Sequence, residues 1–513
     1  MRLLLSRLLA ALPLVLAAEP TAAAWHKASS KHFIIYGDMR PDQLKDFGER
    51  LERFDLAVRR VRGMSDLPLT DSEPLTIFVL RSENAIAKLA GRSASGFYRA
   101  SVSGSYAFVP RIAGSKMDKL ALDADSIFFH EYAHHLQLRS AKVAIPAWIV
   151  EGFAEFFATA KIEKDGSVII GLPPLYRARG LFRLDALTIE EMLGGSGKRL
   201  SAEETELLYG RGWLLTHYLT FDASRDGQLK RYLDSIQQGV PPLQAAKDAF
   251  GDLRALDQEL DRYMRQKFMA VQVNGRSLPV GDVAIRPLDA GEAATIAVHM
   301  RSRRGVDQKA AIAVANDARK AAAPFPKDAF AQAALAEAEF DVGNYEAAEA
   351  AADRALAVDP NYVRALIYKG RARMGLGRKT PGKANWNEVR DWLARANRLE
   401  TENGEPMMLY FQTYLAEGAR PSKNAVDGLL YAVELAPRDY RLRVNAVRQL
   451  LVEGRLVEAK DLFAPLAFQP HTSEKFRVSN AKVMEAILAK DSRTAVSVLD
   501  SAMQDAGPQP RKP

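Results

Sequence analysis

Cysteine is absent from the 513-residue sequence, so disulfides, thiolate catalysis and cysteine-ligated zinc are all excluded. Long apolar runs are lacking too, because beyond residue 24 no segment reaches about 18 consecutive apolar residues, the length of a membrane-spanning helix. Neither charge dominates, since 71 Lys and Arg stand against 63 Asp and Glu, and the positive residues form no block or stripe. We therefore expect no nucleic-acid partner, although the net charge of +8 keeps that alternative open.

Residues 1–24 have the pattern of a secretory signal peptide. Two arginines precede the apolar run 8–18, which is long enough for a signal core and short for a membrane span. The alanines at 22–24 supply the small residues needed for cleavage before Trp25. We expect an exported protein, periplasmic or secreted if the source is bacterial, with no stable membrane span after cleavage. An uncleaved N-terminal anchor is the alternative.

The mature chain divides by its periodicity into two parts. Alternating or continuous apolar runs predict strands, and apolar residues three and four apart predict helices. Strands are expected at residues 32–36, 75–80, 105–109 and 168–171, and helices at 41–62, 118–139, 147–160 and through most of 188–267. This order predicts an α+β domain over residues 25–270. Residues 271–309, with glycine, proline and short extended runs, are expected to form a connector.

The remaining residues, 310–505, contain internal repeats. Residues 329–362 fit a helix-turn-helix period of about 34 residues, with Gly343 in the turn and alanines at 348, 352 and 355 where helices approach closely. Weaker copies follow from residue 363. The pattern resembles the tetratricopeptide repeat (TPR), which implies an all-α solenoid with a concave groove for a protein partner. An ordinary helical bundle is the alternative.

The chemistry is concentrated in the run His130-Glu131-Tyr132-Ala133-His134-His135. On a helix, positions i and i+4 share a face, so His130 and His134 can direct ring nitrogens at one zinc ion. Glu131 lies beside the metal, where it can take a proton from water. His135 is rotated by about 100° and is not an expected ligand.

A second helix is predicted to complete this site. Residues 146–155 read Pro-Ala-Trp-Ile-Val-Glu-Gly-Phe-Ala-Glu, with Pro146 suited to a helix start. Glu151 is a candidate third ligand, and Glu155, one turn later, can hold the other ring nitrogen of a ligand histidine. Carboxylates in such an apolar segment are costly unless they have partners. The alternative is that both face solvent.

The two motifs together resemble the gluzincin metallopeptidases, in particular exported peptidase-MA-like proteins that carry TPRs. The resemblance implies a zincin-like fold for residues 25–270, Zn²⁺ on His130, His134 and Glu151, and Glu131 as general base. Sixteen residues separate His134 from Glu151, fewer than in thermolysin-like relatives. No GxMEN-like segment precedes the zinc helix, which disfavours the aminopeptidase branch.

Stabilisation of an oxyanion needs a further donor. Tyr209 is the candidate that the resemblance favours, and His217, eight residues on, is a second candidate for oxyanion or substrate contact. The alternatives are that Tyr209 only packs and hydrogen-bonds elsewhere, and that His217 is a helix histidine whose ring already has its hydrogen-bond partners. Substrate backbone is expected to pair with an edge strand near residues 105–109, unless that strand is internal to the sheet.

We therefore predict a zincin-like α+β metallopeptidase domain followed by an all-α TPR solenoid. The expected function is that of an exported zinc endopeptidase whose substrate is a protein or peptide and whose repeats recruit a protein partner. One alternative is a TPR scaffold with a zincin-like domain that does not cleave peptides. Another is a zinc hydrolase that acts on a different bond.

Overall fold

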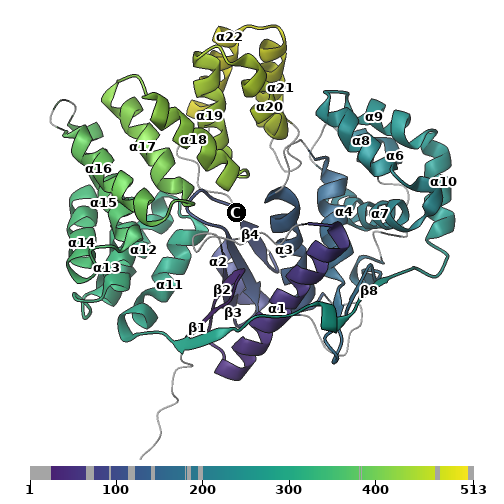
Figure 1. The fold of residues 1–513 in the computed structure, drawn as a ribbon, viewed down its shortest axis with the longest axis horizontal. Helices are drawn as coiled ribbons and strands as arrows, with labels where there is room; N and C mark the ends of the chain where they lie inside the picture. Colours follow the sequence, from purple (N-terminus) through teal and green to yellow (C-terminus); the bar gives the residue numbers. More distant parts are fainter. Residues whose placement is uncertain are drawn as a thin grey trace, which may run out of the picture.

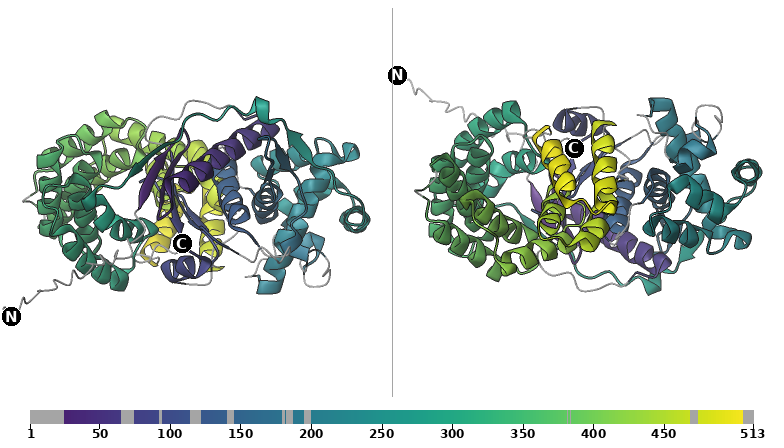
Figure 2. Two further views of the ribbon diagram at one scale, coloured as in Figure 1. Left: turned by 90° about the horizontal axis from the view of Figure 1, so that it is seen from below. Right: turned by 90° about the horizontal axis from the view of Figure 1, so that it is seen from above.

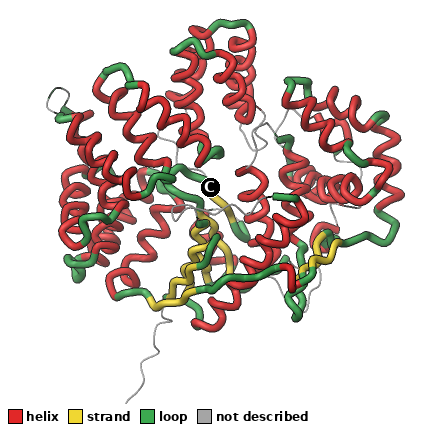
Figure 3. Tube along the Cα trace, in the orientation of Figure 1, coloured by secondary structure: helices red, strands yellow, loops and turns green. Residues whose placement is uncertain are grey.

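The fold is that of a computed structural model, which describes residues 25–64, 74–91, 94–113, 122–139, 145–178, 181, 187–194, 200–380, 382, 384–467 and 474–505. The expected signal peptide lies outside the described residues. The molecule has a mixed centre between two helical parts (Figure 1). Its strands are gathered in the middle and in one small outlying sheet (Figure 3). No described helix has the length and apolar character that crossing a membrane requires.

A six-stranded sheet forms the centre, in the order β4-β5-β3-β2-β1-β9. Strands β2, β3 and β5 run parallel, and β1, β4 and β9 pair antiparallel with their neighbours. The bounds are β1 His26–Ser29, β2 Phe33–Gly37, β3 Leu75–Leu80, β4 Phe97–Arg99, β5 Tyr106–Pro110 and β9 Ala284–Pro287. Because β5 lies between β4 and β3, residues 105–109 are not an edge strand. The expected pairing of substrate with this strand is therefore corrected: its backbone is paired on both sides.

Alternating side chains of the strands build a core on each face of the sheet. One face, with Phe33, Ile35 and Ile77, packs against α1 (Pro41–Arg62) and α3 (Ala124–Arg139). The other face, with Phe78 and Phe108, packs against α2 (Glu83–Ala90) and α11 (Ala290–Arg304). The sheet thus separates the helix with the two histidines from the start of the C-terminal helical array.

A second group of elements follows α3. Helix α4 (Ala147–Ala158) packs against the long helix α7 (Ala202–Phe221). A small sheet joins β6 (Lys161–Ile162), β7 (Val168–Ile170) and β8 (Val271–Val273). The other elements are η1 Leu175–Arg177, α6 Ile189–Gly194, η2 Ala223–Arg225, α8 Gln228–Gln237, α9 Pro242–Phe250, α10 Leu253–Tyr263 and η3 Gly275–Ser277. Residues 188–267 are thus largely helical, as the periodicity predicts.

Helical hairpins make up the C-terminal part and curve around the sheet. After α11 these helices are α12 Gln308–Ala322, α13 Ala329–Asp341, α14 Tyr345–Val358, α15 Val363–Lys379, α16 Trp386–Leu399, α17 Gly404–Glu417, α18 Lys423–Leu435, α19 Tyr440–Val452, α20 Leu456–Ala467, α21 Glu474–Leu488 and α22 Ser492–Asp505. The array turns so far that its last helices lie over the middle of the molecule, as both views of Figure 2 show.

Residues 271–309, expected to be a connector, are built into both parts. Strand β8 pairs with β7, β9 pairs with β1 at the sheet edge, and α11 packs on the sheet and on α12 and α13. The chain therefore passes from one part to the other through shared sheet and core, and not through a free linker.

Candidate metal centre

Helix α3 is held on the sheet by its aromatic face, which leaves the opposite side for the histidines. The ring of Phe129 stacks on Phe54 of α1 with centroids 3.9 Å apart, and Tyr132 donates a 2.7 Å hydrogen bond to Asp55. His130 and His134 lie on the side facing α4, and their Nε2 atoms are 3.1 Å apart. The four-residue spacing thus places both rings at one point.

Glu151 of α4 meets the two histidines. Its Oε2 atom lies 3.5 Å from Nε2 of His130 and 3.6 Å from Nε2 of His134, and its side chain is 1% exposed. Ligand atoms at about 2.0–2.2 Å from a tetrahedral zinc ion are themselves separated by roughly 3.3–3.6 Å. Two of the three separations lie in this range and the Nε2–Nε2 distance of 3.1 Å is slightly shorter, so the three side chains fit a zinc ion after a shift of a few tenths of an ångström.

Close packing of α4 on α7 sets the position of Glu151. A Cβ atom built on Gly152 would lie 2.3 Å from the carbonyl oxygen of Gly212, and one built on Gly212 would lie 2.9 Å from the carbonyl oxygen of Trp148. Two glycines thus let the helix backbones touch. Trp148 further ties α4 to α8 through a 3.3 Å hydrogen bond to the Tyr232 hydroxyl.

Glu155 lies behind His130, one helical turn after Glu151. Its Oε1 atom is 3.3 Å from Nδ1 of His130, and it also accepts hydrogen bonds from Tyr176 (2.8 Å) and Arg177 (2.9 Å) of η1. Burial raises the pKa of Glu155, but the hydrogen bond and charge of His130 and the charge of Arg177 outweigh it, so the net pKa is lowered. A carboxylate held ionised at this atom fixes the ring with Nε2 toward Glu151.

The same carboxylates act on His130. Burial lowers the pKa of its imidazole, but hydrogen bonds to Glu151 and Glu155 raise it to about 10. Arg177 pairs with Glu155, so Glu151 is the carboxylate that remains available to a cation held between the two histidines.

Tyr209 of α7 lies against the histidine pair. Its ring stacks on that of His130 with centroids 5.7 Å apart, and the Arg177 guanidinium lies 4.6 Å from the Tyr209 ring centroid. Its hydroxyl hydrogen-bonds Glu151, and burial together with the charges of Glu151 and Glu131 raises its pKa well above the ordinary value. The phenol therefore remains protonated and can donate.

Glu131 belongs to the same site. It follows His130 on α3, is half-buried, and its charge acts on the Tyr209 hydroxyl. The carboxylate is therefore near enough to the Tyr209 hydroxyl to affect its charge state.

His217 does not serve this site, and its predicted contact with substrate is corrected. Its ring is fully buried, with Nδ1 2.8 Å from the Tyr263 hydroxyl and Nε2 2.9 Å from the backbone oxygen of Met269. Burial, opposed by backbone hydrogen bonds, lowers its pKa to about 4. Although Tyr209 and His217 are on one helix, the ring of His217 enters an aromatic cluster that includes Trp213 and Phe268.

Sequence reasoning missed Tyr176 and Arg177. They lie about 20 residues beyond Glu155, in a short 3₁₀ turn after β7 that has no apolar periodicity. The only signal pointing to them is the free-energy cost of burying the Glu155 carboxylate, which requires a cationic or hydrogen-bonding partner from elsewhere in the chain.

Comparison with known proteins identifies the repeats. Residues 329–372 match the tetratricopeptide repeat family, which confirms a TPR within the predicted region. No curated protein matches the chain. The similarity of residues 25–270 to gluzincins stays a prediction.

Several solved structures of TPR and other proteins are similar to parts of this chain. A thermophilic TPR protein of Thermus thermophilus has 20% identity, with 39% of this chain and 97% of that chain covered and a TM-score of 0.31. The structure of pilF from Pseudomonas aeruginosa has 19% identity and a TM-score of 0.32, with 43% of this chain and 93% of that chain covered. Yeast Tom70 has 14% identity and a TM-score of 0.26, with 64% of this chain and 72% of that chain covered.

Proposed function

We propose that this protein is a zinc-dependent endopeptidase whose TPR solenoid binds a protein partner or substrate. The observation that carries the proposal is the convergence of His130, His134 and Glu151, whose ligand atoms are 3.1–3.6 Å apart. Two histidines and one carboxylate leave a fourth position open, which is the composition of hydrolytic rather than structural zinc sites.

In this proposal, different residues of the chain have different catalytic roles around that position. A zinc ion held there supplies the Lewis acidity that makes a water more acidic and a carbonyl more electrophilic. Glu131 accepts the proton of the attacking water and returns it to the leaving amine. Tyr209, which remains protonated, donates a hydrogen bond to the developing oxyanion once a substrate competes with Glu151 for its hydroxyl.

Glu155 and Arg177 keep the site in order. Glu155 accepts from Nδ1 of His130 and so holds Nε2 toward the ion, while Arg177 neutralises Glu155 and covers the Tyr209 ring. Both are positioning residues, because neither reaches the reacting atoms.

The remaining parts of the proposal rest on the sequence. The TPR match supports binding of a protein or peptide. The pattern of residues 1–24 supports export, to the periplasm or the medium if the source is bacterial.

A second candidate function is a TPR scaffold whose zincin-like domain does not cleave peptides. The comparisons favour this reading, because the family match covers residues within the repeats and not the candidate metal centre. The buried Glu151 supports a functional site, since burying a carboxylate in an apolar helix is costly and Arg177 pairs with Glu155 instead.

Purified full-length protein, loaded with zinc, separates the two candidates. Wild type and Glu131→Gln are incubated with a peptide library and with unfolded protein, and zinc content is measured in parallel. We expect both to bind zinc and only the wild type to cleave. If wild type binds zinc and cleaves nothing, the scaffold is supported; if both cleave equally, Glu131 is not the base.

A further inference from the structure

The solenoid is anchored on the loop between β4 and β5. Val102 in this loop is buried in the apolar cluster of the repeats, and its Cγ2 would lie 3.1 Å from a Cβ built on Gly404 of α17. The Val102 N–H donates to the Asp439 carboxylate over 2.9 Å. The other Asp439 oxygen caps α19 by accepting from the N–H of Leu442. This loop therefore packs as part of the repeat core.

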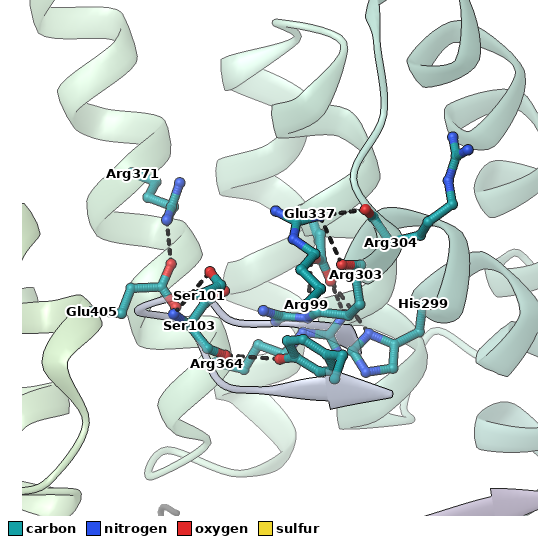
Figure 4. A network of polar contacts seen from close by, with 11 residues as sticks. Arg99, Ser101, Ser103, His299, Arg303, Arg304, Glu337, Arg364, Arg371 and Glu405 are labelled. Carbon is teal, nitrogen blue, oxygen red and sulfur yellow. Dashed lines mark hydrogen bonds and ion pairs between the residues drawn. The ribbon is translucent and has the colours of Figure 1, made fainter. Parts of the chain in front are cut away.

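A buried polar network joins the central sheet to the helical repeats at a second place (Figure 4). Arg99 at the end of β4 donates to the backbone oxygens of Arg303 (3.0 Å) and Arg304 of α11. Glu337 of α13 is in ion-pair contact with Arg303 (3.2 Å) and also pairs with Arg364 of α15. Two independent attachments leave the solenoid little freedom to move relative to the sheet.

A pocket of about 90 Å³ lies at this junction, and both parts of the chain line it. Tyr98 and His135 come from the side of the metal centre, and the turn 435–438 between α18 and α19 comes from the solenoid. His135 is adjacent in sequence to the ligand His134, and its Nδ1 lies 3.0 Å from the Tyr98 hydroxyl. The pocket therefore shares helix α3 with the metal centre, although it contacts a different face of that helix.

Arg438 is the cation of this pocket. It is half-buried, and it forms no hydrogen bond or ion pair with any residue in the described part of the chain. Burial lowers the pKa of its guanidinium, and the charges of Tyr98, Glu151 and Glu131 oppose that change. Its charge thus interacts with the proposed ligand and the proposed base. The carboxylate that lines the pocket, Glu402, instead accepts a 2.6 Å hydrogen bond from Tyr431.

The turn that carries Arg438 is held rigidly. The backbone oxygen of Pro437 accepts from Arg443 over 2.6 Å, and Asp439 is fixed at both carboxylate oxygens. A guanidinium on a fixed turn, facing a small pocket and without a partner among the described residues, is arranged for a planar anion such as a carboxylate.

We propose that Arg438 is a specificity-determining residue of the metal centre, supplied by the solenoid, which binds a carboxylate group of the peptide substrate in this pocket. The inference rests on the proposed function and names its substrate class: peptides with either a free C-terminal carboxylate or an Asp or Glu side chain near the scissile bond. The solenoid then completes the substrate site in addition to binding a partner.

The test uses full-length, zinc-loaded protein and one peptide library in matched forms. The C-terminus is free or amidated, and Asp and Glu are present or replaced by Asn and Gln. The variants are Arg438→Gln, Arg438→Lys and, as a control, Arg441→Gln, which removes the same charge from the exposed face of α19. The two pairs of library forms distinguish the two sources of the carboxylate.

We expect Arg438→Gln to raise KM about 10- to 100-fold for the carboxylate peptides, with little change in kcat and no effect on their neutral counterparts. Arg438→Lys retains part of the affinity, and Arg441→Gln matches the wild type. Equal losses for charged and neutral peptides, or a loss of bound zinc, would show that Arg438 acts on the metal centre itself and overturn the inference.

Binding keeps the inference testable if the protein proves inactive. Affinities of the same peptides for the zinc-loaded Glu131→Gln protein are measured by calorimetry with and without Arg438→Gln. An Arg438-dependent preference for carboxylates supports the inference even if no peptide is cleaved, in which case only the proposed peptidase function fails. Binding that does not distinguish carboxylates from amides overturns it.

Discussion

Replacement of Gly152 by alanine tests whether the contact of α4 with α7 sets the metal centre. The added methyl carbon would lie 2.3 Å from the Gly212 carbonyl oxygen, 2.5 Å from its carbonyl carbon and 2.6 Å from Oγ1 of Thr216. The first two atoms are backbone, so no side-chain rotation relieves the overlap. The helices must therefore separate or tilt.

The size of that movement follows from the distances. Relaxed contacts between non-bonded heavy atoms are about 3.5 Å, so the backbones must part by about 1 Å. Overpacking of this kind costs about 1–3 kcal/mol of folding free energy. Glu151 precedes Gly152, and its oxygen has to stay at about 2.0–2.2 Å from the ion. We expect zinc affinity to fall by about 10- to 100-fold, as is typical when a residue that orients a ligand is lost.

Zinc affinity is measured by competition with a chelator, and stability by denaturant unfolding with and without zinc. Gly428→Ala is the matched control, because its Cβ meets Met407 at 3.7 Å, an ordinary contact. The free energy of unfolding of the control should rise by about 0.5–1 kcal/mol, because alanine replaces a glycine within a helix, and the control should retain zinc. If Gly152→Ala binds zinc as tightly as the wild type, the packing of α4 on α7 does not set the site.

Three further predictions concern other residues. Tyr209→Phe retains zinc but loses about 10²–10³-fold in kcat if the hydroxyl stabilises the oxyanion, as peptide cleavage rates would report; an unchanged kcat would assign Tyr209 to packing. Burial lowers the pKa of His217 to about 4, so below its unfolded pKa of about 6.5 the unfolded chain takes up a proton that the folded chain refuses. Stability contributed by His217 is therefore present above pH 6.5 and falls by about 2 kcal/mol at pH 5, and His217→Gln should show a shallower decline in denaturant unfolding between pH 7 and 5. Glu337→Gln leaves Arg303 and Arg364 buried without their carboxylate and should cost about 3–5 kcal/mol in the same assay; a loss below about 1 kcal/mol would contradict the role assigned to this network.

Local patterns predicted the two helices that carry the candidate ligands. The His130–His134 spacing and the run after Pro146 correspond to α3 and α4, because side chains on one helix face are fixed by the helix period alone. Glu155 reaches His130 for the same reason. The TPR at 329–372 was detectable because small residues recur where its helices touch.

Local patterns did not predict the strands whose partners lie far away in the sequence. Strands β1, β4 and β9 are three to four residues long and acquire their places from partners elsewhere in the sheet. Strand β9 in particular lies in a segment expected to be a connector. Short strands carry little periodicity, so their pairing is decided by tertiary packing.

The same reasoning explains which site residues were found. Tyr209 was a candidate because of the family resemblance. For His217, on the same helix, the alternative of a packing histidine holds, because helix position alone does not show that Tyr263 and the Met269 backbone oxygen hydrogen-bond both of its ring nitrogens. Arg438 is 287 residues beyond Glu151 in the sequence, and only the curvature of the solenoid brings them together.

The most direct test of the account is the zinc content of the purified full-length protein, measured by mass spectrometry after loading with zinc and removal of excess metal. Wild type should retain about one zinc ion per chain, and Glu131→Gln the same amount, because Glu131 is a base and not a ligand. Glu151→Ala and His134→Ala should retain none while remaining folded by circular dichroism. Wild type without zinc, or ligand variants that bind zinc as well as wild type, would contradict the assignment of His130, His134 and Glu151 as a metal centre.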